Sequence, residues 1–336
     1  MDLELRNFLA EYQLLSAGED AICTPLAGGV SCDVWRVDVG ARSICVKRAL
    51  PRLRVAALWE APVARSTHEW RWLKFAAGIV PESIPRLLAH DPARAMLAME
   101  FLEPAEFPVW KQLLLQGEAS TETARSVAAI LARLHAASAG NEEIAARFDT
   151  GDAFYALRIE PYLLEAARRN PDVTDVLHRL AEKTLSVRIA LVHGDYSPKN
   201  ILVGPHSPVI LDAETAWYGD PSFDLAFCLN HLLLKCFARP AWRDNYIACF
   251  DAFTSRYLSS VSWEAPVELE RRTVRLLSAL LLARVDGKSP VEYLTEADRA
   301  LVRQMSLSWL AGPPENLEQL VEAWRAALSA KQAPAG

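Results

Sequence analysis

The pattern of apolar and polar residues in the first hundred positions predicts mainly β-structure. Residues 34–37 and 43–46 are rich in β-branched and aromatic residues and flank a turn at 39–41, which is typical of a hairpin. A glycine turn at 28–31 comes before them, and glycine permits a sharp bend because it tolerates positive φ. Residues 64–77 have a helical composition that ends at Gly78, and 95–100 form an apolar run that predicts another strand.

Beyond about residue 105 the pattern becomes mainly helical. Val127, Ile130, Leu131 and Leu134 fall at i, i+3, i+4 and i+7, which predicts one buried helical stripe. The other segments with a helical pattern are 173–184, 224–237, 268–286 and 316–330, and the short apolar runs that predict strands among them are 189–192, 201–203 and 209–211.

These patterns together predict an α+β fold with two lobes. We expect a small β-rich N-terminal lobe over residues 1–103, a larger and mainly helical C-terminal lobe over 104–330, and a frayed tail at 331–336. A cleft between two such lobes is the expected place for a ligand.

Composition narrows the classes of function. The chain has 336 residues, of which 51% are hydrophobic, so it can bury a large core. Its formal net charge of −6 argues against a protein built mainly to bind nucleic acid or an anionic membrane. The N-terminus lacks the features of a signal peptide and no apolar run reaches the length of a membrane span.

The six cysteines form no C-x-x-C pair, and their spacing suits neither a zinc site nor a secreted disulfide scaffold. We therefore expect reduced, mostly buried thiols in a cytoplasmic protein. The sequence leaves a monomer and a homodimer equally open.

The candidate chemistry lies on two loops among the short strands. Asp195 and Asn200 lie in the loop after the run 189–192, and Asp212 follows the run 209–211. Polar residues on loops held by a scaffold indicate function more than packing. Phosphoryl transfer needs a carboxylate that accepts the proton of the attacking hydroxyl, and oxygen ligands for magnesium. Asp195 fits the first role, and Asn200 and Asp212 fit the second.

The spacing D-x-x-x-x-N…D resembles the catalytic and metal-binding loops of protein kinases. In this chain His193-Gly194-Asp195 stands in place of H-R-D, and Asp212-Ala213-Glu214 in place of D-F-G. With the run G-D-P-S-F-D-L-A at 219–226, these motifs resemble the aminoglycoside phosphotransferase and choline kinase-like family over roughly residues 20–300. The resemblance implies a protein-kinase-like fold, ATP and Mg²⁺ as cofactors, and a small molecule whose hydroxyl accepts the phosphate.

The same resemblance implies a nucleotide site in the first lobe. A lysine at the end of a strand holds the phosphates and pairs with a glutamate on the next helix, the glycine turn covers the phosphates, and the segment 98–102 receives the adenine. The residues that match these roles are Lys47, Glu69, Gly28, Gly29, Ser31, Glu100 and Leu102.

One segment resembles a narrower group of relatives. Residues 46–54, with Trp59 beyond them, are similar to the N-terminal lobe of methylthioribose kinases, and the Asp212/Glu214 pair is similar as well. Asn200 departs from that group, which usually lacks a loop asparagine. The similarity of residues 46–54 nevertheless favours a sugar or polyol-like acceptor. Amino alcohols and aminoglycoside-like compounds are left open.

Each candidate residue also has an ordinary structural interpretation. Asp195, Asn200 and Asp212 are residues that commonly cap helices and turns, although their spacing favours catalysis. Glu214 fits a second magnesium or a surface ion pair. His193 and Asp224 are expected to support the loop, and the simplest role for Asp224 is to N-cap the helix that it begins.

Three further questions stay open at this stage. The cluster Arg48, Arg52 and Arg54 fits a solvated face or an anion site, and residues 284–288 fit an ordinary helix end or a wall of the acceptor pocket. The alternative to a working kinase is a nucleotide-binding pseudokinase or regulator without turnover. Such proteins usually lose the lysine, the base or a metal ligand, and this sequence retains all three.

Overall fold

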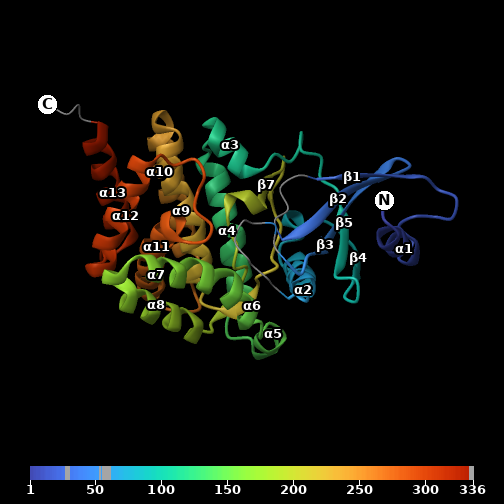
Figure 1. Cartoon of the computed structure of the whole chain (residues 1–336), viewed down its shortest axis with the longest axis horizontal. Coiled ribbons are helices and arrows are strands. Elements are labelled where there is room, and N and C mark those ends of the chain that lie inside the picture. Colours follow the sequence, from blue (N-terminus) through green and yellow to red (C-terminus); the bar gives the residue numbers. More distant parts are fainter. Residues whose placement is uncertain (27–30, 53, 55–61, 333–336) are drawn as a thin grey trace.

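The computed structural model describes residues 1–26, 31–52, 54 and 62–332. Figure 1 shows two lobes, with the N-terminus beside the sheet of one lobe and the C-terminus at the far end of the other. The N-terminal lobe holds an antiparallel sheet in the order β1-β2-β3-β5-β4. Its elements are α1 (Leu3–Glu11), β1 (Ala21–Pro25), β2 (Cys32–Val39), β3 (Arg42–Ala49), α2 (Arg65–Ala77), η1 (Pro81–Ser83), β4 (Leu87–Asp91) and β5 (Met96–Glu100).

The alternation of side chains along β3 determines the direction in which its buried lysine, Lys47, points. Val46 is buried in the cluster that contains the apolar side chains of α1. Because successive side chains of a strand point to opposite faces, Lys47 points to the other face, on which α2 lies and supplies Glu69. The β2–β3 hairpin turns at Gly40, whose φ of 57° is one that glycine adopts without strain.

The helix α2 links the two lobes. Its Glu69 pairs with Lys47 of the sheet. One turn further along, Trp72 and Leu73 belong to the large core of the C-terminal lobe. The helix ends at Gly78, where the sequence predicted its end.

The C-terminal lobe is mainly helical. Its helices are α3 (Trp110–Gln116), α4 (Thr121–Ser138), α5 (Glu142–Arg147), α6 (Gly151–Phe154), the π-helix η2 (Tyr155–Leu164), α7 (Glu165–Arg169), η3 (Pro171–Val173), α8 (Thr174–Ser186), η4 (Pro198–Asn200), α9 (Ser222–Ala238), η5 (Pro240–Trp242), α10 (Arg243–Leu258), α11 (Pro266–Asp286), α12 (Glu296–Ala311) and α13 (Leu317–Gln332). Its strands are β6 (Ala190–Val192), β7 (Ile201–Val203), β8 (Pro208–Ile210) and β9 (Trp217–Gly219), paired as β6–β9 and β7–β8.

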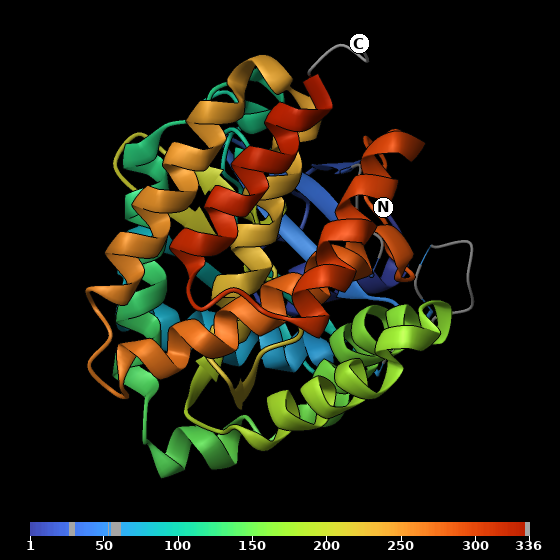
Figure 2. The same ribbon diagram turned by 90° about the vertical axis from the view of Figure 1, so that its left-hand side faces the viewer.

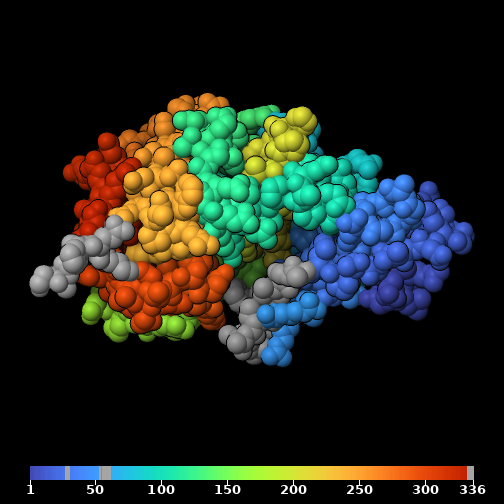
Figure 3. All heavy atoms as spheres, turned by 90° about the horizontal axis from the view of Figure 1, so that it is seen from above, coloured from blue at the N-terminus to red at the C-terminus, as the bar shows by residue number. Residues whose placement is uncertain are grey.

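The core of this lobe forms around α9 and α11. Almost the whole of α9 is buried, and it packs against α10 and α11, while α4 packs on α10. The predicted stripe of α4, which includes Val127 and Leu131, lies in this core. Figure 2 shows the helices of the C-terminal end in front of the strands, and Figure 3 shows a narrower N-terminal lobe joined to the broader helical one.

The structure confirms the predicted α+β fold with two lobes, and it corrects details. The predicted tail begins too early, because α13 continues through Gln332; residues 333–336 lie outside the described residues. All six cysteines are free, and four of them are buried. No helix in the described part of the chain is long and apolar enough to cross a membrane.

Candidate active site

A cavity of about 610 Å³ lies between the lobes and collects most of the candidate residues. The polar candidates that line it are Ser31, Lys47, Glu69, Glu100, Asp195, Asn200, Asp212 and Glu214, and Leu102 lines it as well. Gly28 and Gly29 lie outside the described residues. His193 and Asp224 lie behind the cavity wall, in contact with the loop that carries Asp195.

Lys47 joins the two lobes through two carboxylates. Its ammonium nitrogen lies 2.6 Å from Glu69 Oε1 and 2.6 Å from Asp212 Oδ1. Burial by itself lowers the pKa of Lys47, but Asp212 and Glu69 raise it well above its ordinary value. Burial raises the pKa of Glu69 against the opposing effect of Lys47. The lysine is therefore charged, and it links Glu69 of α2 to Asp212 across the cavity.

Asp195 is buried and faces two cations. Its Oδ2 atom lies 2.9 Å from Arg158 Nη2 and 2.9 Å from Lys199 Nζ, whereas no described residue hydrogen-bonds to its buried Oδ1 atom. Burial opposes ionisation of Asp195, but Arg158 and Lys199 outweigh it and lower the pKa of the carboxyl. One oxygen of an ionised carboxylate is thus left to accept a hydrogen bond or a proton from a ligand.

The loop around Asp195 is held by its own histidine. The His193 Nδ1 atom accepts a hydrogen bond from the Asp195 backbone N–H at 3.1 Å, and Nε2 lies 3.1 Å from the Leu211 carbonyl. This pair of contacts fits a neutral ring with its proton on Nε2. Burial lowers the pKa of His193, in agreement with a neutral ring.

Asp224 holds the same loop, and the predicted N-cap is wrong. The helix α9 begins at Ser222, so Asp224 lies inside its first turn. Its two carboxylate oxygens accept hydrogen bonds from the backbone N–H groups of His193 at 2.7 Å and Gly194 at 2.8 Å. Both oxygens are directed to the loop because a buried N–H without a partner is costly.

Asn200 and Asp212 form a donor set that suits magnesium. The Asn200 amide nitrogen donates to the Asp195 carbonyl at 3.0 Å, which leaves its oxygen for a cation. Asp212 has a φ of 68°, an uncommon conformation of the kind that collects at functional sites. No group of three or more His, Cys, Asp or Glu side chains in the described residues is placed to hold a metal. Magnesium is commonly bound by one or two carboxylates with phosphates and water, and the residues present fit that mode.

Glu214 occupies a buried position, so the alternative of a surface ion pair is wrong. Its Oε2 atom lies 2.9 Å from Arg65 Nε, and both side chains are almost fully buried. Arg65 also donates to the carbonyl oxygens of Ser31 and Leu50, each at 2.6 Å. This arginine therefore joins the start of α2, the strand edge beside Ser31 and the Asp212–Glu214 segment.

Glu100, the last residue of β5, lines the cavity together with Phe101 and Leu102, which follow it. No described residue accepts a hydrogen bond from the Leu102 backbone N–H. The arginine cluster lies elsewhere. Arg48 and Arg54 both pair with Asp33, and neither is among the residues that line the cavity.

Sequence analysis missed Arg158 and Arg65, and it assigned no role to Lys199. Arg158 lies in the π-helix η2 and donates to the Gly194 carbonyl at 2.5 Å, 36 positions along the chain. An arginine within the apolar run 155–164 was the one available indication of a buried cation. No motif in the sequence distinguishes Arg65.

Replacing Gly194 with alanine is expected to destabilise the protein and reduce its activity. Gly194 has a φ of 77°, and an added Cβ would lie 2.6 Å from the Thr215 carbonyl oxygen. Gly140 is the matched control, since its φ of 68° is similar and its surroundings are open. We expect Gly140→Ala to cost about 1 kcal/mol of unfolding free energy and Gly194→Ala on the order of 3 kcal/mol. Urea unfolding measures both, and equal losses would show that the contact with Thr215 is unimportant.

Solved structures share this fold along nearly the whole chain. Amicoumacin kinase in complex with AMP-PNP, Ca²⁺ and Ami matches with a TM-score of 0.56 and 12% identity, covering 94% of this chain and 98% of that one. Plasmodium vivax ethanolamine kinase matches with a TM-score of 0.55 and 12% identity, covering 95% and 88%. Macrolide 2'-phosphotransferase from Brachybacterium faecium has a TM-score of 0.51 and 19% identity, covering 99% of both chains. The fold is therefore the two-lobed, protein-kinase-like fold.

The family of the chain follows from a match of its sequence to a family model. Residues 22–258 match the model of the phosphotransferase enzyme family known as APH, so the chain belongs to this family. Methylthioribose kinases of Bacillus cereus and Bacillus mycoides are each 24% identical over 272 residues, which is 69% of this chain. The match spans 65% of the Bacillus cereus relative and 66% of the Bacillus mycoides one.

Proposed function

We propose that this protein transfers the γ-phosphoryl group of ATP to a hydroxyl of a small molecule, with Asp195 as the catalytic base. The observation that carries the proposal is the convergence, in one cavity, of a charged lysine, an ionised carboxylate with a free oxygen, and two oxygen donors for a metal. These are Lys47, Asp195, Asn200 and Asp212. Family membership supports the same reaction class.

Each residue of the site has a separate role in the proposed reaction. Asp195 Oδ1 accepts the proton of the acceptor hydroxyl, whose oxygen forms a bond to the γ-phosphorus. The bond between the γ-phosphorus and the β–γ bridging oxygen breaks, and ADP leaves with that electron pair. Arg158 and Lys199 hold Asp195 in place and keep it ionised until it accepts the proton. Lys47 holds the nucleotide phosphates, and Glu69 orients its ammonium group.

Magnesium would be held by Asn200 and Asp212, with Glu214 as a candidate second carboxylate. The ion supplies charge neutralisation for the phosphates. Both carboxylates already pair with a cation, Asp212 with Lys47 and Glu214 with Arg65. The Asp212 side chain is 26% exposed and that of Glu214 only 8%, so Asp212 is the more accessible ligand. The backbone groups of Glu100 and Leu102 are proposed to receive the adenine, and Ser31 to lie beside the phosphates.

The acceptor class rests on the relatives. The curated relatives named methylthioribose kinase support a sugar-like or polyol-like acceptor. The test is nucleotide consumption over a panel of sugars, polyols, amino alcohols and aminoglycosides, with magnesium present. We expect acceptor-dependent ADP formation. Tight nucleotide binding with no acceptor-dependent turnover across the panel would favour the pseudokinase alternative instead.

A further inference from the structure

Part of the C-terminal wall of the cavity is rich in positive charge. Arg158, Lys199 and Lys288 line this part together with Tyr162 and Ser289. Asp212 and Glu214 line the cavity as well, but they are paired with Lys47 and Arg65. Arg158 and Lys199 share the single carboxylate of Asp195. Two cations thus face one anion at the position proposed for the reacting hydroxyl.

A further cation, Arg284, lies behind this wall, across the ring of Tyr162. The guanidinium carbon of Arg158 lies 5.9 Å from the centre of the Tyr162 ring, and that of Arg284 lies 6.0 Å from the same ring. Arg284 donates to the Ser289 carbonyl at 2.6 Å. It is 91% buried, and no described residue hydrogen-bonds to its Nε atom. Arg284 is therefore one side chain away from the partner of the catalytic carboxylate.

Lys235 on α9 is a second buried basic residue near Arg284. It is almost fully buried, and its partner is the Tyr293 hydroxyl at 3.2 Å, with the ring of the same tyrosine 4.4 Å from the ammonium nitrogen. No ion pair within 4 Å joins Lys235 or Arg284 to a described carboxylate, and Glu292, the carboxylate that acts on Lys235, is paired with Lys111. A buried cation without a counter-charge is costly. Arg284 does not line the cavity, so a negatively charged ligand in the cavity is favoured through the field of Arg284 across Tyr162.

We propose that the acceptor carries an anionic group, a carboxylate or a phosphate, in addition to the hydroxyl that is phosphorylated. This inference rests on the proposed function, since it concerns the acceptor end of the same cavity. The anionic group lies at Lys288, which lines the cavity, within the field of Arg284 behind Tyr162. The same field opposes cationic acceptors such as amino alcohols and aminoglycosides.

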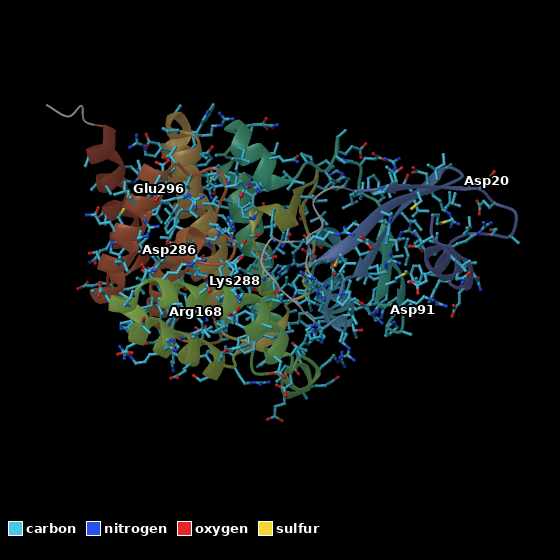
Figure 4. All side chains as sticks on the ribbon, viewed as in Figure 1. Asp20, Asp91, Arg168, Asp286, Lys288 and Glu296 are labelled. Atoms are coloured by element: carbon cyan, nitrogen blue, oxygen red, sulfur yellow. The ribbon has the colours of Figure 1, made fainter. Side chains whose placement is uncertain are left out.

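The chain provides a matched control for Lys288. Its ammonium lies 2.8 Å from Glu160 Oε2, and Arg168 lies 2.7 Å from the other oxygen of the same carboxylate. Both residues are labelled in Figure 4, on the C-terminal lobe, but of the two only Lys288 is among the residues that line the cavity. Lys288→Gln and Arg168→Gln each remove one cation from Glu160, so a difference between them reports contact with the acceptor.

The first arm of the test measures binding by calorimetry, with magnesium and a nonhydrolysable ATP analogue present. The probes are D-gluconate, D-glycerate and D-glucose 6-phosphate as anions, D-glucose and glycerol as neutral compounds, and ethanolamine as a cation. We expect at least one anion to bind tighter than any neutral or cationic probe. We expect Lys288→Gln to weaken that binding about tenfold or more, and Arg168→Gln to leave it within about twofold. The carboxylates and the sugar phosphate distinguish the two sources of charge.

The second arm measures turnover of the same compounds and separates the two claims. Turnover of neutral or cationic acceptors in preference to every anion would overturn this inference and leave the proposed kinase activity standing. Anion binding that depends on Lys288 without turnover would support the charge assignment and count against the kinase activity. Equal effects of Lys288→Gln and Arg168→Gln on anion binding would overturn the inference.

A stability measurement tests the same charge imbalance without any ligand. Burial, then Lys111 and Arg284, lower the pKa of Lys235 from its ordinary value of 10.5 to about 7, against the opposing effect of Glu292. The unfolded chain therefore binds more protons than the native state between pH 7 and pH 10, so stability rises with pH over that range.

Lys235→Met removes this contribution. We expect the variant to be more stable than the parent near pH 7, and the difference to shrink towards pH 10. Thermal unfolding across that range measures it. A difference that does not change with pH would show that the ammonium of Lys235 is compensated in the native state.

Discussion

Replacing Asp195 with asparagine is expected to lower kcat by about 10² to 10⁴ and to change nucleotide affinity little. General base catalysis contributes a factor of that size, and the asparagine oxygen cannot accept the proton of the acceptor hydroxyl as a carboxylate does. Asparagine is preferred to alanine because it still accepts a hydrogen bond from Arg158, which is buried beside it. Removing one partner of a buried pair altogether costs about 3–5 kcal/mol and would confuse the result.

The control for this variant is Asp91→Asn. Asp91 is also a buried aspartate with an arginine partner, Arg94, and accepts hydrogen bonds from backbone N–H groups. It lies at the end of β4, away from the cavity residues (Figure 4). Steady-state kinetics and nucleotide titration should show a loss of turnover in Asp195→Asn alone. If Asp195→Asn retained the parent kcat, Asp195 would not be the base.

Replacing Asp212 with asparagine is expected to weaken binding of the magnesium–nucleotide complex at least tenfold and to lower kcat as well. The substitution removes the negative charge that a hard cation prefers. It keeps a residue that tolerates the positive φ of 68° at this position. Lys47 keeps its partner Glu69 at 2.6 Å, so the lysine stays oriented.

The magnesium dependence of this variant is the decisive readout. We expect half-maximal activity to require more magnesium in Asp212→Asn than in the parent. Glu82→Gln is the control, because Glu82 is an exposed carboxylate whose pair with Arg133 is of a kind that contributes little to stability. A magnesium dependence like that of the parent would exclude Asp212 as a ligand.

Patterns in the sequence predicted the elements whose formation depends on neighbouring residues. The hairpin at Gly40, the end of α2 at Gly78 and the apolar stripe of α4 each depend on residues close together in the chain. The spacing of Asp195, Asn200 and Asp212 was also sufficient to predict that these residues share one cavity. Their distances to Lys47 and Glu69 follow from the way α2 joins the sheet to the helical lobe.

The parts that were missed depend on contacts between distant segments. Arg158 reaches the loop of Asp195 from a π-helix, and a π-helix has no hydrophobic period that sequence analysis recognises. For Asp224 the expected support of the loop agrees with its hydrogen bonds from the backbone N–H groups of His193 and Gly194. Only the N-cap role was wrong, because α9 begins two residues earlier, at Ser222. Arg158, Lys235 and Arg284 likewise come near one another only when η2, α9 and α11 pack together.

The most direct test of the account is a product analysis by ³¹P NMR. The protein is mixed with ATP, magnesium and each compound of the acceptor panel, and the phosphorus signals are followed with time. The account predicts one new phosphomonoester that appears in step with ADP, and its absence with Asp195→Asn. ATP that binds but stays intact with every acceptor, or that yields only inorganic phosphate, would contradict the assignment as a small-molecule kinase.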